Sequence, residues 1–357
     1  KTALKAHGLD KSGHLYKVNS FDFHRFEETI RLTDDPDYNQ AAFEGMLEIK
    51  GDSDHTKLIE MLDALNDDSQ KIDDVLDTYF DTENLVYWLA FQILTGNCDT
   101  QNRNCYLYSP LNSKVWYFLD WDNDGMLRKL ELSLTGFSDY ASWERGVSNY
   151  WGNVLFNRAL RSKSFRRELD DAVKDLRSYM TEERLAKMIK HYREVTESLV
   201  FAAPDIDNLP VTKDQYEQIA AAIPAEIEEN YKSFRESYKK PMPFYIGMPQ
   251  IDNGKLRINW DASYDFKARD IRYTVELARD YAIKDVVFKA EDVLLPEVTC
   301  DAPDTGQYFV RVRATNSDGY TQDAFDYYVT DDGKQYGMLC FYVQDGGKVV
   351  GDTYEEG

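Results

Sequence analysis

Two stretches rich in carboxylate and amide side chains are the parts of this sequence best suited to chemistry. The first spans residues 96–108 and contains Asp99 and, five positions later, Asn104. The second spans residues 116–125 and contains Asp122, which follows Asp99 by 23 positions. Each stretch adjoins a hydrophobic run of the kind that forms a β-strand. The two stretches are therefore candidates for one site.

The residue types in these stretches suit metal-assisted phosphoryl transfer. An aspartate on a loop, such as Asp99, can accept a proton from a hydroxyl group. An asparagine five residues on, in an extended segment, can reach back to the same space, and Asp122 adds a carboxylate at the end of the next strand. Magnesium takes one or two carboxylates together with substrate phosphates. We therefore expect a catalytic base beside a divalent-metal site.

Calcium binding is a competing interpretation of the second stretch. The run from Asp120 through Asp122, Asp124 and Gly125 to Glu131 satisfies the twelve-residue EF-hand pattern. An EF-hand needs an entering helix, however, and residues 116–119 favour a strand. Calcium held by these oxygens in another geometry stays open, as does a simple role of the polar side chains in capping turns.

Length and charge limit the classes of protein that fit. A chain of 357 residues is long enough for two domains. Its net charge of −22 argues against a nucleic-acid or anionic-membrane surface, which needs clustered Lys and Arg. The sequence contains no CxxC pair, which argues against a zinc ribbon. No apolar run reaches the roughly 18 residues of a membrane span.

The first two thirds of the chain are mainly helical in pattern. A buried helix is expected over 82–94, ending at Gly96, so that Asp99 lies on a loop at the end of that helix. Two strands follow, at 106–108 and 115–119, and helical periodicity returns from about 152 to 238. We expect a domain over residues 1–240.

Residues 241–335 change to alternating strands with turns between them, which is typical of an all-β sandwich. This segment resembles a fibronectin type III domain. Trp260 stands where that family has its buried tryptophan, and the run that begins at Tyr308 is similar to its tyrosine corner. Residues 336–357 would be a strand-like extension with an acidic tail.

Residues 1–240 resemble the CotH kinase family, the spore-coat protein H group of atypical kinases. The resemblance rests on three motifs in order: Gly96-Asn97-Cys98-Asp99, Asn104-Cys105-Tyr106-Leu107-Tyr108 and Trp121-Asp122-Asn123-Asp124. Ordinary protein kinases also place an asparagine five residues after the catalytic aspartate. The fold class implied is α+β and multidomain: a mostly helical, kinase-like C-lobe followed by a fibronectin- or immunoglobulin-like sandwich.

The resemblance also assigns roles. Asp99 would be the catalytic base, Asn104 and Asp122 the metal ligands, and Asp124 an assisting ligand. The cofactors would be ATP with Mg²⁺ or Mn²⁺, with Ca²⁺ the alternative noted above. The partner would be a protein that presents a serine or threonine, at a bacterial cell or spore surface.

Some features depart from the family pattern. Gly125-Met126-Leu127 replaces the usual Phe-Gly ending, and Asp120 takes a position that is often small or proline. The family's N-terminal lobe, which contacts ATP, would precede Lys1, and no glycine-rich phosphate loop occurs. We expect a full-length kinase to be active and this piece to be inactive. The alternatives are a non-catalytic assembly or adhesion protein and a calcium-stabilised scaffold.

Overall fold

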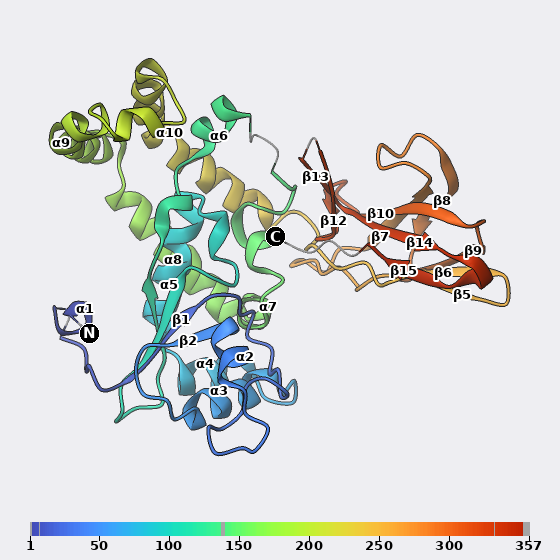
Figure 1. Ribbon diagram of the computed structural model, residues 1–357, viewed down its shortest axis with the longest axis horizontal. Coiled ribbons are helices and arrows are strands. Elements are labelled where there is room, and N and C mark those ends of the chain that lie inside the picture. Colours follow the sequence, from blue (N-terminus) through green and yellow to red (C-terminus); the bar gives the residue numbers. More distant parts are fainter. Residues whose placement is uncertain (1, 7, 137–139, 332, 353–357) are drawn as a thin grey trace. The chain divides into compact units, whose positions relative to one another are not determined.

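The computed structural model describes residues 2–6, 8–136, 140–331 and 333–352, and it divides into two compact units. Unit 1 comprises residues 1–138 and 149–234, and unit 2 comprises residues 139–148 and 235–357. Unit 1 is mainly helical and unit 2 is built of antiparallel strands (Figure 1). The expected α+β, multidomain class is thus confirmed. Among the described residues, no helix is long and apolar enough to cross a membrane.

A four-stranded antiparallel sheet in the order β2-β1-β3-β4 lies in unit 1. Its strands are β1 (His14–Val18), β2 (Leu47–Ile49), β3 (Cys105–Ser109) and β4 (Tyr117–Asp120). In β3, every residue except the half-buried Tyr106 is buried, so both faces of this inner strand are covered over most of its length. The β3–β4 pairing sets Cys105 opposite Asp120, so both candidate stretches meet at one end of this hairpin.

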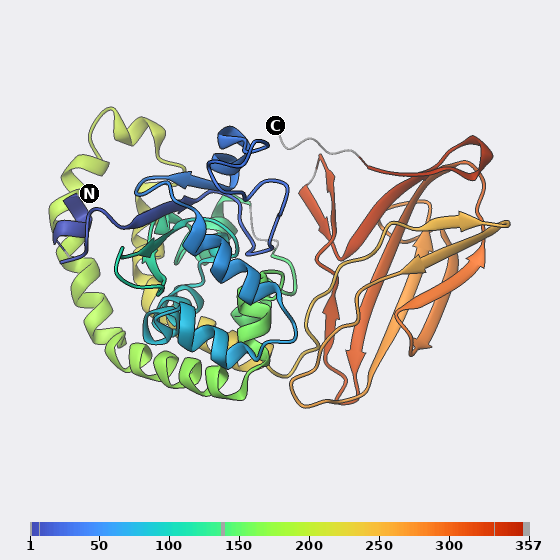
Figure 2. The same cartoon turned by 90° about the horizontal axis from the view of Figure 1, so that it is seen from below.

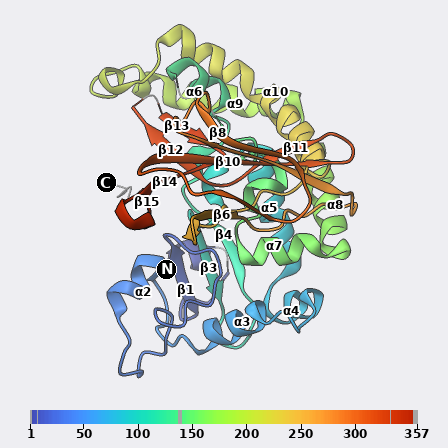
Figure 3. The same cartoon turned by 90° about the vertical axis from the view of Figure 1, so that its right-hand side faces the viewer.

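Ten α-helices are described in the chain: α1 (Thr2–Ala6), α2 (Gln40–Met46), α3 (Thr56–Asn66), α4 (Ile72–Tyr79), α5 (Thr82–Thr95), α6 (Lys129–Thr135), α7 (Val154–Arg161), α8 (Lys163–Tyr179), α9 (Glu182–Val200) and α10 (Lys213–Ser237). Helices α3 and α4 lie side by side (Figures 1 and 3). Helix α5 is the central one: nine of its residues are buried, and it contacts both α8 and β4. The predicted buried helix over 82–94 is therefore present, one residue longer.

Unit 2 contains the remaining strands: β5 (Gln250–Asp252), β6 (Lys255–Asn259), β7 (Ile271–Ala278), β8 (Val286–Val293), β9 (Glu297–Asp301), β10 (Gly306–Asn316), β11 (Thr321–Asp323), β12 (Tyr327–Thr330), β13 (Gly333–Tyr336), β14 (Met338–Val343) and β15 (Val349–Gly351). They form a large sheet in the order β15-β14-β10-β7-β8 with β11 beside β10, a sheet β5-β6-β9 and the hairpin β12-β13. Figure 2 shows these strands in yellow to red.

The core of unit 2 forms as the alternating pattern predicts. Trp260 is buried in it, together with Val310 and Val312 of β10. The Tyr308 hydroxyl donates to the backbone oxygen of Asp304 at 3.0 Å, a contact typical of a tyrosine corner. These features fit an all-β unit of antiparallel sheets, and the assignment to fibronectin type III stays a prediction.

Candidate functional site

The loop with Asp99 begins where α5 ends. Asp81 caps the start of α5 by accepting a hydrogen bond from the Asn84 backbone N–H at 2.9 Å. Gly96 ends the helix in the left-handed conformation, with φ of 66°. A side chain there would also meet Asn230, whose amide nitrogen would lie 2.6 Å from the added Cβ. Glycine therefore lets the chain turn sharply out of a buried helix and start the Asp99 loop.

Buried polar contacts with the segment before α7 fix the buried side of this loop. The Thr100 and Tyr150 hydroxyls are 2.8 Å apart, and the Tyr150 hydroxyl also donates to the Asn97 backbone oxygen at 3.3 Å. The Asn153 amide donates to the backbone oxygen of Gln101 at 2.9 Å. Burial raises the pKa of Tyr150, so its hydroxyl keeps its proton and remains a donor. The segment before α7 therefore holds the loop in one conformation.

Asp99 and Asn104 are in direct contact, as the five-residue spacing predicts. The Asn104 side-chain amide donates to Asp99 Oδ2 at 2.8 Å, and Asn104 adopts a left-handed backbone with φ of 58°. Arg103 Nε lies 3.5 Å from Asp99 Oδ1, with both side chains about half exposed. The Asp99 carboxylate thus lies at the surface in a fixed setting, where a substrate hydroxyl can approach it.

The turn after β4 packs directly against this loop. Leu127 donates its backbone N–H to the Thr95 carbonyl at 2.8 Å, which ties the end of the turn to the end of α5. A Cβ added at Gly125 would lie 2.7 Å from Asn97 Oδ1 and 3.4 Å from the Asp99 Cβ. Only a residue without a side chain fits so close. The structure therefore brings the two candidate stretches together.

A chain of buried amides connects the two stretches. Gln92 of α5 donates through Nε2 to Asp120 Oδ1 at 2.9 Å and to Asn123 Oδ1 at 3.3 Å. Asn97 donates to Gln92 Oε1 at 3.0 Å and accepts the Asp99 backbone N–H at 3.3 Å. Gln92 is fully buried and Asn97 almost so. Successive hydrogen bonds thus connect Asp120 to Gln92, Gln92 to Asn97, and Asn97 to Asp99.

Asp120 differs from the other aspartates of the turn. The residue as a whole is exposed, but packing around its carboxylate raises its pKa above the ordinary value. Contacts with Asn123, Gln92 and Trp88 oppose part of that shift. The Trp88 indole N–H is buried and makes no direct hydrogen bond. Its effect on the Asp120 pKa is therefore exerted over a longer distance. Gln92 is the donor that directly contacts the Asp120 carboxylate.

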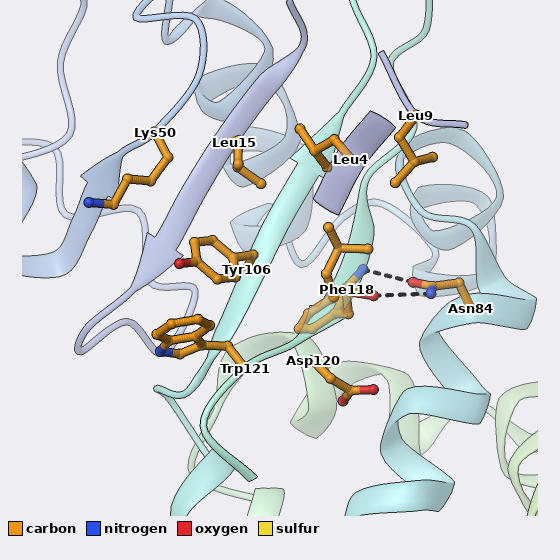
Figure 4. A pocket seen from close by; sticks show the side chains of 10 residues that line it. Leu4, Leu9, Leu15, Lys50, Asn84, Tyr106, Phe118, Asp120 and Trp121 are labelled. Carbon is orange, nitrogen blue, oxygen red and sulfur yellow. Dashed lines mark hydrogen bonds between the residues drawn. The ribbon is translucent and has the colours of Figure 1, made fainter. Parts of the chain in front are cut away.

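A cavity of about 690 Å³ opens beside Asp120 (Figure 4). Tyr106 and Trp121 line it, with ring centroids 5.3 Å apart in an edge-to-face arrangement. Leu15 and Leu119 add apolar surface, and Lys50 adds an ammonium group. An apolar cavity with aromatic walls and few charged groups suits a planar ligand.

The predicted site residues are brought together in part. Asp99 and Asn104 are hydrogen-bonded to each other, and the turn that contains Asp122 and Asp124 is adjacent to them. Asp122 and Asp124 themselves are exposed, and Asp122 has a left-handed backbone with φ of 55°. Within the described ranges, no three His, Cys, Asp or Glu side chains are grouped so as to hold a metal ion. The carboxylates of the turn are near the loop without being gathered around one point.

The EF-hand geometry is not present. Strand β4, and not a helix, enters the candidate loop. At its twelfth position, Glu131 accepts two hydrogen bonds from Arg128, at 3.0 and 2.9 Å, and is thus engaged in an ion pair. Calcium binding in another geometry stays a prediction.

Three residues that shape the site were not among the predicted site residues. Gln92 and Asn97 form the buried connection, and Asp120, not Asp122, lines the cavity. Gln92 had a detectable signal, because it is an uncharged polar residue inside a helix that is otherwise apolar nearly all round. A polar side chain in that setting needs a hydrogen-bond partner. Its partner could not be named from the sequence alone.

Comparisons with known proteins identify the family of the kinase-like part of the chain. The family model described as CotH kinase protein matches residues 1–234, which include all of unit 1 and the candidate site. No curated protein matches the chain. Among solved structures, the twitchin kinase region from C. elegans (Fn31-NL-kin-CRD-Ig26) is similar at 17% identity, over 27% of this chain and 20% of that one. Its TM-score is 0.20, so this likeness carries no argument about fold or function.

Proposed function

Because the chain belongs to the CotH kinase family, we propose that its kinase-like part transfers the γ-phosphoryl group of ATP to a serine or threonine hydroxyl of a protein. The observation that carries this proposal is the 2.8 Å hydrogen bond between Asn104 and Asp99, on a loop packed against the turn with Asp122. Phosphoryl transfer depends mainly on positioning and on charge stabilisation, and this arrangement supplies parts of both.

Asp99 would orient the acceptor hydroxyl and accept its proton. Its carboxylate is reachable from solvent, and the donation from Asn104 to Oδ2 fixes its orientation. The backbone of the loop is held by the contacts of Asn97, Thr100 and Gln101 described above. A base held in this way needs little rearrangement when a hydroxyl binds, which is the advantage of a preorganised site.

The donors available for a divalent cation are oxygen atoms. Asn104 uses its amide nitrogen toward Asp99, which leaves its Oδ1 for a cation, and Asp122 and Asp124 offer exposed carboxylates. Oxygen donors with few carboxylates fit Mg²⁺ or Mn²⁺. Such an ion would neutralise charge on the transferred phosphoryl group. Asn104, Asp122 and Asp124 are the residues that would hold it.

The cavity beside Asp120 is the proposed place for the base of ATP. Tyr106 and Trp121 provide aromatic surface, and Leu119 provides an apolar floor. Lys17 lies 5.7 Å from the Trp121 ring, and Lys50, which forms an ion pair with Glu48, lines the same cavity. The Lys17 ammonium would favour an anionic group of the ligand.

The test is transfer of labelled phosphate from ATP, with Mn²⁺ or Mg²⁺, by the full-length kinase to itself and to a serine- and threonine-containing peptide library. We expect Asp99→Asn to lower the rate about 100-fold or more, as loss of a general base does. The matched control is Asp68→Asn, because the Asp68 side chain is 99% exposed. Equal incorporation by the wild type, Asp99→Asn and Asp122→Asn would refute the proposal.

The alternative is a non-catalytic assembly or adhesion protein at a bacterial cell or spore surface, or a scaffold stabilised by Ca²⁺. The exposed carboxylates of Asp122 and Asp124 favour the scaffold version, since they offer oxygen ligands without fixed geometry. The scaffold version predicts that Ca²⁺ raises the melting temperature, that Asp122→Ala removes this rise, and that ATP has no effect on the melting temperature. Calorimetric titration with ATP in Mn²⁺ separates the two functions.

A further inference from the structure

Gln92 is a fully buried amide on the helix that precedes the Asp99 loop. Its neighbours on α5, such as Leu89 and Ile93, are buried and apolar. Burying an amide among such residues is costly unless its hydrogen-bonding atoms have partners. The position of Gln92 therefore requires specific partners, and both of its ends have them.

The two ends of Gln92 contact the two halves of the site. Its nitrogen donates to Asp120 Oδ1 at 2.9 Å and, more weakly, to Asn123 Oδ1 at 3.3 Å. Its side-chain oxygen accepts from the Asn97 amide at 3.0 Å, and its backbone oxygen accepts from the Asn97 N–H, also at 3.0 Å. One side chain thus touches the turn after β4 and the loop after α5.

Asn97 connects Gln92 to Asp99 by hydrogen bonds to both residues. Its Oδ1 accepts the Asp99 backbone N–H at 3.3 Å and lies against Gly125 of the turn. We infer that Gln92 is a positioning residue, which keeps the Asp99 loop and the Asp120–Gly125 turn in register; its consequence for the reaction rests on the proposed function. Gln92 acts through Asn97 and Asp120 and does not itself reach the surface.

The chemistry of the contacts requires glutamine at this position. A glutamate would lack the N–H donor and would place a second carboxylate against Asp120. A leucine would leave both the Asn97 amide and the Asp120 carboxylate without this partner. The Trp88 indole N–H does not make a direct hydrogen bond and so does not replace it.

Hydrogen exchange of the full chain tests the positioning directly. We expect Gln92→Leu and the near-isosteric Gln92→Glu to speed amide exchange about tenfold in both 97–104 and 120–127, because each variant opens the shared contact. The matched control is Asn66→Leu, which removes two 2.9 Å hydrogen bonds to the backbone oxygens of Phe23 and Leu62 elsewhere in unit 1. Unchanged exchange in either segment of both Gln92 variants would overturn the inference.

Mn²⁺ binding in the presence of ATP, followed by electron paramagnetic resonance, tests the consequence for the site. We expect both Gln92 variants to bind Mn²⁺ about tenfold more weakly, as loss of a residue that supports metal ligands does, and Asn66→Leu to bind as the wild type does. Wild-type affinity in the Gln92 variants would overturn the inference while leaving the proposed function intact. A wild-type chain that binds no Mn²⁺ would refute the proposed function, and the exchange experiment would still decide whether Gln92 positions the two segments.

Discussion

The loop that carries Asp99 and the turn that carries Asp122 are supported differently, although the sequence presents them as similar clusters. Buried Asn97 and Thr100 anchor the loop through side-chain contacts on its inner side. The turn is attached through Asp120 and Asn123 to Gln92 and through Leu127 to Thr95, whereas Asp122 is exposed. Under the proposed function this difference is useful, because a catalytic base profits from a fixed position, whereas metal ligands can gather when the ion binds.

This comparison predicts that changes to the buried side of the loop have the largest effect. Asn97→Leu should lower the free energy of unfolding of unit 1 by about 3 kcal/mol, because it leaves the Gln92 oxygen and the Asp99 N–H without their partner. The measurement is urea unfolding followed by the helical circular-dichroism signal, to which all-β unit 2 contributes little. The control, Asn112→Leu, changes an exposed loop residue. A loss no larger than that of the control would show that the loop is not anchored through Asn97.

The contact between loop and turn should be the next most sensitive feature. Gly125→Ala places a Cβ within 2.7 Å of Asn97 Oδ1, so one segment must shift, and we expect a loss of about 2 kcal/mol. Gly45→Ala is the control, since its Cβ would meet nothing within 4 Å and alanine favours the helix there. Equal stability of the two variants would contradict close packing of the turn on the loop.

Asp120 makes the stability of the turn dependent on pH. Its pKa is raised above the ordinary 3.8 by burial of the carboxylate, so the folded state binds this proton more readily than the unfolded chain. The contribution of Asp120 to stability should therefore fall as pH rises from 3.8 through the raised value. Asp120→Asn should flatten that part of the stability curve, measured by urea unfolding at a series of pH values. An unchanged slope would mean that the carboxylate is well solvated.

Sequence reasoning found the parts of the site that depend on local spacing. The contact of Asn104 with Asp99 follows from a spacing of five residues in one loop, although Asn104 is left-handed and not extended as expected, and the buried α5 follows from its apolar pattern. The connection through Gln92 joins residues 28 positions apart and depends on how β4 packs on α5, which periodicity does not determine. The cavity likewise needs residues from several distant segments, such as Lys50 and Trp121.

The smallest effect is expected at Asp122, and it would sharpen the comparison most. Because Asp122 is exposed, Asp122→Asn should change the unfolding free energy by less than about 0.5 kcal/mol without metal. Under the proposed function, the same variant should still weaken Mn²⁺ binding in the presence of ATP, as measured by calorimetry. Asn is also well suited to the left-handed backbone at this position. A clear loss of stability without metal would mean that Asp122 is part of the folded framework, and that the turn is as rigidly built as the loop.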